Sequence, residues 1–336
     1  MKKLVIGVDI GGINTAFGLV DENGDLYAES VISTKKYPYV DDYKAYVADL
    51  CDAMHAMADS LSFDYELAGI GIGAPNANYH KGTIETPANL WKFREDEPNP
   101  DESRRIFPLV EDIARCFGGV KTLMTNDANA ATIGEMVYGN AKGMRDFIMV
   151  TLGTGLGSGF VANGEMIYGS DGFAGEFGHI PFFDNEIICS CGKKGCLETE
   201  VSGIAIEEKM CHLIENGRNT ILKEKYDQQK SIHIDDIIAA AKNDDNLSIE
   251  LIEEAGEKMG KAVAFLINTF NPETVIVGGN LAAAGDYIML PLKSSTNKYS
   301  LNLVYKDTKF RLSKMGKTAS AWGAAMLIRN QVLGLC

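Results

Sequence analysis

Three cysteines and one histidine stand at the spacing of metal ligands in one glycine-containing segment of the chain. Thiolate sulfur and imidazole nitrogen are the usual ligands of structural zinc, which takes four of them in a tetrahedron. Four protein ligands leave no open position for a metal-bound water, so we expect the metal to shape a loop rather than to perform chemistry. The alternatives are three reduced core cysteines or a disulfide, and the odd total of seven cysteines disfavours the disulfide. The predicted ligands are His179, Cys189, Cys191 and Cys196.

A second set consists of short polar side chains in loops that glycine or proline punctuates. Amide and carboxylate groups of this kind form hydrogen bonds with the hydroxyl groups of a ligand. Asn126 and Asp127 also come directly before an alanine-rich helix, where either one can serve simply as the helix N-cap. The residues predicted to hold a ligand with several hydroxyls are Asn89, Asn126, Asp127, Glu176, His179 and Glu198.

A duplicated pattern of strands and helices is expected to position these residues. Residues 3–33 contain three strand patterns, with a Gly-Gly turn after the first and an Asn-Gly turn signal after the second, and residues 146–168 repeat that order. A helix pattern and a further strand follow in each copy, with the helices at 42–60 and 248–270. We therefore predict two duplicated α/β lobes around a cleft, with glycine turns that grip a phosphate chain from two sides.

Composition limits the class of protein. The chain has 336 residues, 46% of them hydrophobic, which suits about two domains. It has neither a signal-peptide pattern nor an apolar run long enough to span a membrane, and reduced cysteines are typical inside cells, so we expect a cytoplasmic protein without a membrane partner. The net charge of −14 argues against nucleic acid as a partner. It does not exclude a nucleotide, because backbone amides and a metal ion can hold the phosphates of a nucleotide.

Seven motifs together resemble those of the ROK family of sugar kinases, in an order that covers almost the whole chain. The cysteine element and the EFGH motif before it are the most specific of them. The resemblance implies the actin-like ATPase (ribonuclease H-like) fold, with a smaller α/β lobe at 1–124 plus 318–336 and a larger lobe at 125–317 that holds the zinc loop. The motifs are DIGG from Asp9, ETPAN ending at Asn89, ND at 126–127, TLGTGLGSG from Thr151, GEFGH ending at His179, CSCGKKGCLE ending at Glu198, and VGGN from Val277.

The resemblance also implies a role for each group of residues. Asp127 is implied to be the general base for a sugar hydroxyl that attacks the γ-phosphate of ATP, and the polar set named above is implied to bind the sugar. His179 would offer one ring nitrogen to zinc and the other to a sugar hydroxyl. Mg²⁺ is implied as the companion of ATP, held by Asp9 through water, and a homodimer is implied as the assembly. The implied nucleotide-binding residues are Asp9, Gly11, Gly12, Gly153, Thr154, Gly155, Gly157, Gly278 and Gly279.

The substrate and the class of protein leave alternatives open. Glucose is the predicted substrate, with N-acetylmannosamine, N-acetylglucosamine and allose as alternatives, because the loop sequences do not reveal the pocket width near the C2 substituent. A ROK-type sugar-responsive transcriptional regulator would need a DNA-binding helix-turn-helix, for which we expect no room ahead of Asp9. Ile13 stands where the family usually has threonine in its first phosphate loop, so a hydroxyl that could help to hold phosphate is missing. Two further alternatives follow: a kinase with weakened ATP binding, or a sugar-binding protein without catalysis.

Overall fold

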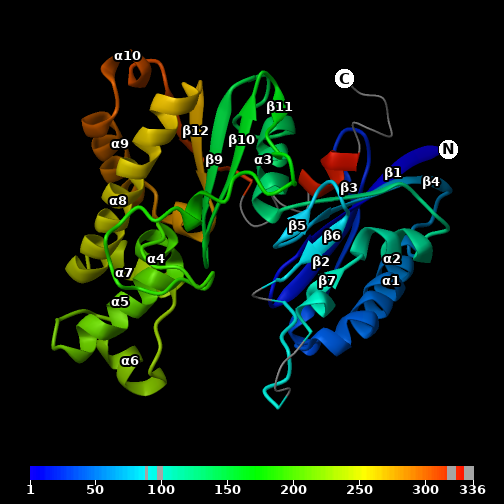
Figure 1. Ribbon diagram of the computed structural model, residues 1–336, viewed down its shortest axis with the longest axis horizontal. Helices are drawn as coiled ribbons and strands as arrows, with labels where there is room; N and C mark the ends of the chain where they lie inside the picture. The colour runs from blue at the N-terminus through cyan, green and yellow to red at the C-terminus, as the bar shows by residue number, and fades with distance from the viewer. Residues whose placement is uncertain (88–89, 97–100, 316–322, 329–336) are drawn as a thin grey trace. The chain divides into compact units, whose positions relative to one another are not determined.

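The computed structural model describes residues 1–87, 90–96, 101–315 and 323–328, and these form two compact units (Figure 1). The first unit contains Met1–Tyr138, Tyr168–Ala174 and the helical residues 323–328. The second contains Gly139–Ile167 and residues 175–315.

The first unit extends past the predicted boundary at residue 124. The helix that follows this point packs within the first unit, where the hydroxyl of Tyr138 donates a hydrogen bond to Sδ of Met326 at 3.0 Å. Of the segment 318–336 that was expected to complete this lobe, residues 323–328 lie in the described part of the chain, and they are helical.

The sheet of the first unit has the strand order β3-β2-β1-β4-β8. The first three strands form an antiparallel meander, and β4 and β8 continue the sheet in parallel to β1. The strands are β1 (Lys2–Ile10), β2 (Asn14–Val20), β3 (Leu26–Ser33), β4 (Tyr65–Gly73) and β8 (Thr122–Thr125). A small sheet adds β5 (Ala77–Asn78), β6 (Thr83–Glu85) and β7 (Ile106–Phe107). The three strands predicted within 3–33 are thus confirmed.

Helices cover both faces of this sheet because side chains alternate along β4. Ile70 and Ile72 pack in one hydrophobic core with α1 (Tyr43–Asp59) and α2 (Leu109–Cys116). The other face carries Gly71 and Gly73, against which residues 323–328 and α3 (Asp127–Val137) pack closely. Apolar side chains recur at helical spacing along α1 and form a stripe that is buried throughout, at Tyr43, Tyr46, Val47, Leu50, Met54 and Met57. Its burial is the main stabilisation of α1 on the sheet.

The second unit repeats the pattern with the strand order β11-β10-β9-β12-β13. Its antiparallel meander is β9 (Phe147–Leu152), β10 (Leu156–Ala162) and β11 (Glu165–Met166), and the parallel additions are β12 (Thr274–Gly278) and β13 (Lys309–Leu312). The predicted Asn-Gly hairpin has Asn163 and Gly164 at φ values of 56° and 83°, the left-handed conformation of a tight hairpin turn. The predicted duplication is therefore confirmed.

Helices of the second unit form one core with its sheet. Among the described residues α8 is the longest helix, with 25 residues, and charged side chains occur along it. In the described part of the chain, no helix combines the length and apolar composition needed to cross a membrane. The helices are α4 (Glu198–Val201), α5 (Gly203–Glu215), α6 (Lys223–Gln229), α7 (Ile234–Ala241), α8 (Asn246–Phe270), α9 (Asp286–Tyr299) and α10 (Asn302–Tyr305).

Candidate functional site

The parallel strands of the first unit bring predicted site residues to one edge of its sheet. Asp9 of β1 pairs in register with Gly73 of β4, and Gly73 pairs with Thr125 of β8. The carboxyl ends of the three strands therefore lie in one row. Asp9, the turn at Gly11 and Gly12, and the Asn126–Asp127 pair all stand at this edge, which is where ligands bind in open α/β sheets.

Asn126 and Asp127 divide two roles between them. Asn126 is the N-cap of α3, with Oδ1 accepting a hydrogen bond from the Ala128 N–H at 2.8 Å. Asp127 is the first residue of the helix, and its Oδ1 shares that same N–H at 2.8 Å. The cap interpretation thus holds for Asn126, and the Asp127 carboxylate is not needed for capping.

The Asp127 carboxyl is exposed on the surface of its unit. Desolvation by surrounding protein raises its pKa above the ordinary value, and the backbone N–H groups of Ala128 and of Asp127 itself act in the opposite direction. A carboxylate at this position is suited to accept a hydrogen bond or a proton from a hydroxyl group.

The glycine-rich segments of the second unit also meet at one strand edge. Thr151 of β9 and Gly278 of β12 are paired in register, so the loop at Gly153–Gly155 and the turn at Gly278–Gly279 follow neighbouring parallel strands. Within the first loop the Gly153 N–H donates to the Gly155 carbonyl at 3.0 Å. Thr154 is exposed, and Gly155 and Gly157 are half-buried. Exposed backbone N–H groups in such loops suit phosphate oxygens.

Gly279 is a position where only glycine fits. Its φ is 82°, and a Cβ atom would lie 2.2 Å from the carbonyl oxygen of Leu152. We expect Gly279→Ala to destabilise the second unit by about 3 kcal/mol, since both backbone strain and a backbone clash result. Denaturant unfolding checks this.

Gly217→Ala is the matched control. Gly217 has a φ of 84°, and no atom lies near the position of an added Cβ. Its substitution therefore measures the cost of backbone strain without a steric clash. We expect its cost to be about 1 kcal/mol. Equal stability of the two variants would contradict a role for the close approach of Gly279 to β9.

Three predicted ligand-binding residues of the second unit surround the cysteine loop. Glu198 begins α4, and its Oε2 accepts a hydrogen bond from the Leu156 N–H at 2.8 Å. Its Oε1 lies 3.6 Å from the sulfur of Cys189. His179 ends a short 3₁₀ turn (Phe177–His179), and its Nε2 lies 3.9 Å from Oε2 of Glu176. The cysteine loop therefore contacts two of the three residues, Glu198 and His179, and His179 in turn lies beside Glu176.

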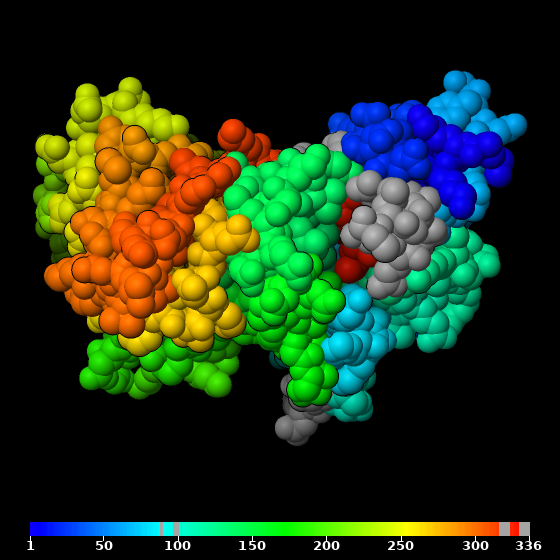
Figure 2. All heavy atoms as spheres, turned by 90° about the horizontal axis from the view of Figure 1, so that it is seen from above, coloured from blue at the N-terminus to red at the C-terminus, as the bar shows by residue number. Residues whose placement is uncertain are grey.

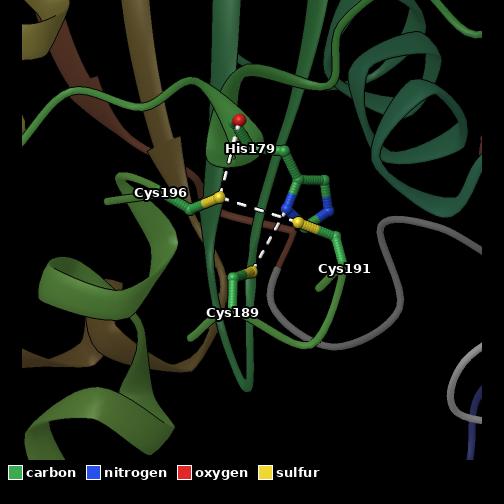
Figure 3. Close-up of side chains that lie close together, drawn as sticks. All are labelled: His179, Cys189, Cys191 and Cys196. Atoms are coloured by element: carbon green, nitrogen blue, oxygen red, sulfur yellow. Dashed lines mark hydrogen bonds between the residues drawn. The ribbon is translucent and has the colours of Figure 1, made fainter. Parts of the chain in front are cut away.

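The four predicted metal ligands converge on one point (Figure 3), with their ligand atoms all within 4.8 Å of one another. The sulfur of Cys189 lies 3.5 Å from Nδ1 of His179, and the sulfurs of Cys191 and Cys196 are 3.6 Å apart. Tetrahedral zinc with Zn–S distances of about 2.3 Å places ligand atoms about 3.5–3.8 Å apart, whereas a disulfide requires about 2.05 Å. The donor set and its spacing fit zinc.

Without a metal, burial raises the pKa of the Cys196 thiol to about 12, and it also raises the pKa of Cys189. Neighbouring thiols add to the shift at Cys196, because clustered thiolates repel one another. A bound divalent cation reverses this balance by stabilising the thiolates.

The ETPAN segment carries backbone strain at Thr86, a β-branched residue that precedes a proline. Its φ is 44°, a value that costs about 1–3 kcal/mol for such a residue. The Thr86 N–H donates to the Arg105 carbonyl at 2.8 Å, which helps to hold this conformation. Asn89, the last residue of the motif, lies outside the described residues.

The predicted residues thus fall into two groups, one in each unit. The first unit holds Asp9, Gly11, Gly12, Asn126 and Asp127, and the second holds Gly153, Thr154, Gly155, Gly157, Glu176, His179, Glu198, Gly278, Gly279 and the metal ligands.

Gly203 was missing from the predicted residues. It begins α5, donates its N–H to the Gly153 carbonyl at 2.7 Å, and so anchors the glycine loop to a helix. Its only signal in the sequence is the preceding Ser202, which caps α5 by accepting the N–H of Ala205.

Comparison with known proteins agrees with the motifs. The family model described as ROK family matches residues 5–331. The chain is similar to a glucokinase of Halalkalibacterium halodurans, with 30% identity over 97% of this chain and 95% of that protein. It is also similar to a xylose repressor of Caldicellulosiruptor bescii, with 30% identity over 80% of this chain and 64% of the repressor.

A solved structure confirms the predicted actin-like ATPase fold. It is a ROK family glucokinase from Streptomyces griseus in complex with glucose and AMPPNP, 28% identical, with a TM-score of 0.77 over 97% of this chain and 99% of that one.

Proposed function

The chain belongs to the ROK family, and we propose that it is an ATP-dependent hexose kinase. One observation carries this proposal. Asp127 stands at the same strand edge as Asp9 and the first glycine turn, while Asn126 supplies the helix cap. In the proposed reaction the Asp127 carboxylate orients a sugar hydroxyl and accepts its proton as the oxygen attacks the γ-phosphate of ATP. The bond from the γ-phosphorus to the bridging oxygen breaks, and ADP leaves.

The remaining residues are proposed to bind and to orient. Asn126 keeps its Nδ2 for a sugar hydroxyl after its Oδ1 caps α3, and Glu198 and Glu176 offer carboxylate oxygens. The glycine turns in the two units are proposed to hold the phosphates through backbone N–H groups. Asp9, half-buried at the end of β1, is a hard oxygen donor that fits Mg²⁺, and this ion would neutralise charge on ATP.

Zinc is proposed to be structural. His179 would bind it through Nδ1, which faces the sulfurs, and this leaves Nε2 on the side of Glu176 for a sugar hydroxyl. The metal would thereby fix the ring of one sugar-binding residue and the loop beside another, Glu198. All four ligands come from the protein, so no reaction step passes through the metal.

Glucose is the proposed substrate, with glucose 6-phosphate as product. The support is the similarity to the glucokinases of Halalkalibacterium halodurans and Streptomyces griseus over nearly the full length of both chains. N-acetylmannosamine, N-acetylglucosamine and allose are the alternatives, since contacts near C2 discriminate the N-acetylated sugars from glucose and contacts near C3 discriminate allose. We also propose that the protein is a homodimer, on the resemblance alone.

A sugar-responsive regulator is the second candidate function, and the similarity to the xylose repressor favours it. The match spans 64% of the repressor, compared with 95% of the glucokinase, and this difference supports the kinase.

The test is ADP release from MgATP by zinc-replete protein with glucose, mannose, allose, fructose, N-acetylglucosamine and N-acetylmannosamine. We expect glucose to have the highest kcat/KM, because its ring hydroxyls match the polar set. A different dominant sugar would replace glucose and keep the kinase. No sugar-dependent ADP release from any of the six would contradict the kinase and favour sugar binding without catalysis.

A further inference from the structure

A pocket of about 330 Å³ lies on the second unit between α8 and α9. Figure 1 shows the two helices side by side, and Figure 2 shows α9 (orange) at the surface of this unit. The volume is at the lower end of the range of small-molecule pockets. None of its lining residues belongs to the proposed sugar, nucleotide or metal sites.

The walls of this pocket are rigid because α8 and α9 approach closely. A Cβ atom on Gly260 would lie 2.3 Å from the Leu292 carbonyl oxygen, so the helix backbones are nearly in contact. Two hydroxyls of α9 bind the backbone of α8: Ser295 donates to the Glu257 carbonyl at 2.6 Å, and Thr296 donates to the Gly260 carbonyl at 3.0 Å. The side chains that line the pocket therefore project from a fixed frame.

Lys258, Lys261 and Lys298 line the pocket together with the rings of Phe183 and Tyr299. The Lys261 ammonium lies 6.0 Å from the Phe183 ring centroid and 5.7 Å from that of Tyr299. The Lys298 ammonium lies 5.3 Å from the Tyr299 centroid. These cation–π contacts restrain two flexible side chains and hold their charges at the pocket.

Two of these three lysines have no acidic partner among the residues that the structure describes. Lys258 is paired with Glu200 and Glu254. Lys261 and Lys298 form no ion pair with any residue in the described part of the chain, where aromatic rings are their partners. In a protein of net charge −14, two unpaired cations at one rigid pocket provide a local attraction for an anion.

We propose that this pocket binds a small phosphate ester with free hydroxyl groups, the chemistry of a sugar phosphate. Lys261 and Lys298 bind the phosphate through charge-assisted hydrogen bonds. Glu257 and Ser294, both exposed at the pocket, bind hydroxyl groups of the ester. The Glu257 carboxylate repels a phosphate group of either kind, but only an ester supplies hydroxyl groups that donate to this carboxylate, so the pocket favours an ester over inorganic phosphate. The site stands apart from the proposed kinase site and does not depend on kinase activity.

The test is calorimetric titration of the zinc-replete full chain with glucose 6-phosphate, inorganic phosphate and glucose. The wild-type protein is compared with the double variant Lys261→Gln/Lys298→Gln and with Lys293→Gln, a control on α9 that does not line the pocket. We expect the double variant to lose one equivalent of bound glucose 6-phosphate, through a drop in affinity of roughly tenfold per lysine. Lys293→Gln retains this equivalent, and glucose alone does not bind at the pocket.

Identical isotherms for the wild-type protein and the double variant would overturn the proposal. Inorganic phosphate bound at the pocket as tightly as glucose 6-phosphate would overturn the assignment of an ester. Circular dichroism and the steady-state kinetics of the double variant should match the wild type, which excludes misfolding. If the wild-type protein showed no kinase activity but its isotherm with glucose 6-phosphate still differed from that of the double variant, the proposed kinase function would be refuted and the proposed phosphate-ester site supported.

Discussion

Replacing Asp127 with asparagine is expected to lower kcat of sugar-dependent ADP formation by about 10³-fold, within the range for loss of a general base. Asparagine keeps the shape and the Oδ1 acceptor for the Ala128 N–H, and Asn126 still caps α3. The fold should therefore persist, with at most about 1 kcal/mol lost from the favourable interaction of the carboxylate with the helix N-terminus. KM for ATP should change little. Steady-state kinetics and thermal unfolding measure both quantities.

Asp59→Asn is the matched control for this charge change. Asp59 is the last residue of α1, is exposed, and forms no ion pair with a described residue. Its substitution should leave kcat unchanged. If Asp127→Asn retained near-wild-type turnover, Asp127 would not be the general base. If both variants lost activity equally, the effect would come from net charge rather than from the site.

Replacing Cys191 with serine is expected to remove most of the bound zinc and to lower the melting temperature of the second unit by roughly 10 °C, equivalent to several kcal/mol. Cys191 is the most useful ligand to change because its side chain is exposed, whereas Cys189 and Cys196 are buried. An exposed thiol contributes almost nothing to stability through packing. A large loss of stability in Cys191→Ser would therefore come from loss of the metal ion that this sulfur binds. Elemental analysis and thermal melts measure the two effects together.

Cys116→Ser provides the comparison, since Cys116 is also exposed but lies on α2, away from the metal ligands. We expect wild-type zinc content and stability for it. A chelator should lower the melting temperature of wild-type protein to that of Cys191→Ser and leave the variant unchanged. The cysteine loop contacts Glu198 and shares the metal site with His179. In Cys191→Ser, KM for the sugar should therefore rise more than KM for ATP. Normal metal content in Cys191→Ser would refute the assignment.

Local features of this protein could be predicted from the order of its residues. The cysteines of the metal site come from one loop, so their spacing in the chain already limits the distances between their sulfurs. The strands and helices of the two units follow from short-range hydrophobic periodicity, as the fully buried stripe of α1 illustrates. The Asn163–Gly164 turn follows from the conformations that these two residue types tolerate.

Features that join distant segments required the folded chain. Sequence left open which of Asn126 and Asp127 caps the following helix, and the folded chain assigned the cap to Asn126. The row of Asp9, Gly73 and Thr125 depends on strand register, and the contact of Gly203 with Gly153 depends on helix packing. The lysine pocket exists because α8 and α9 pack through their backbones. Register and packing are set by non-local hydrogen bonds and by burial of apolar surface, whose partners no local pattern of residues specifies.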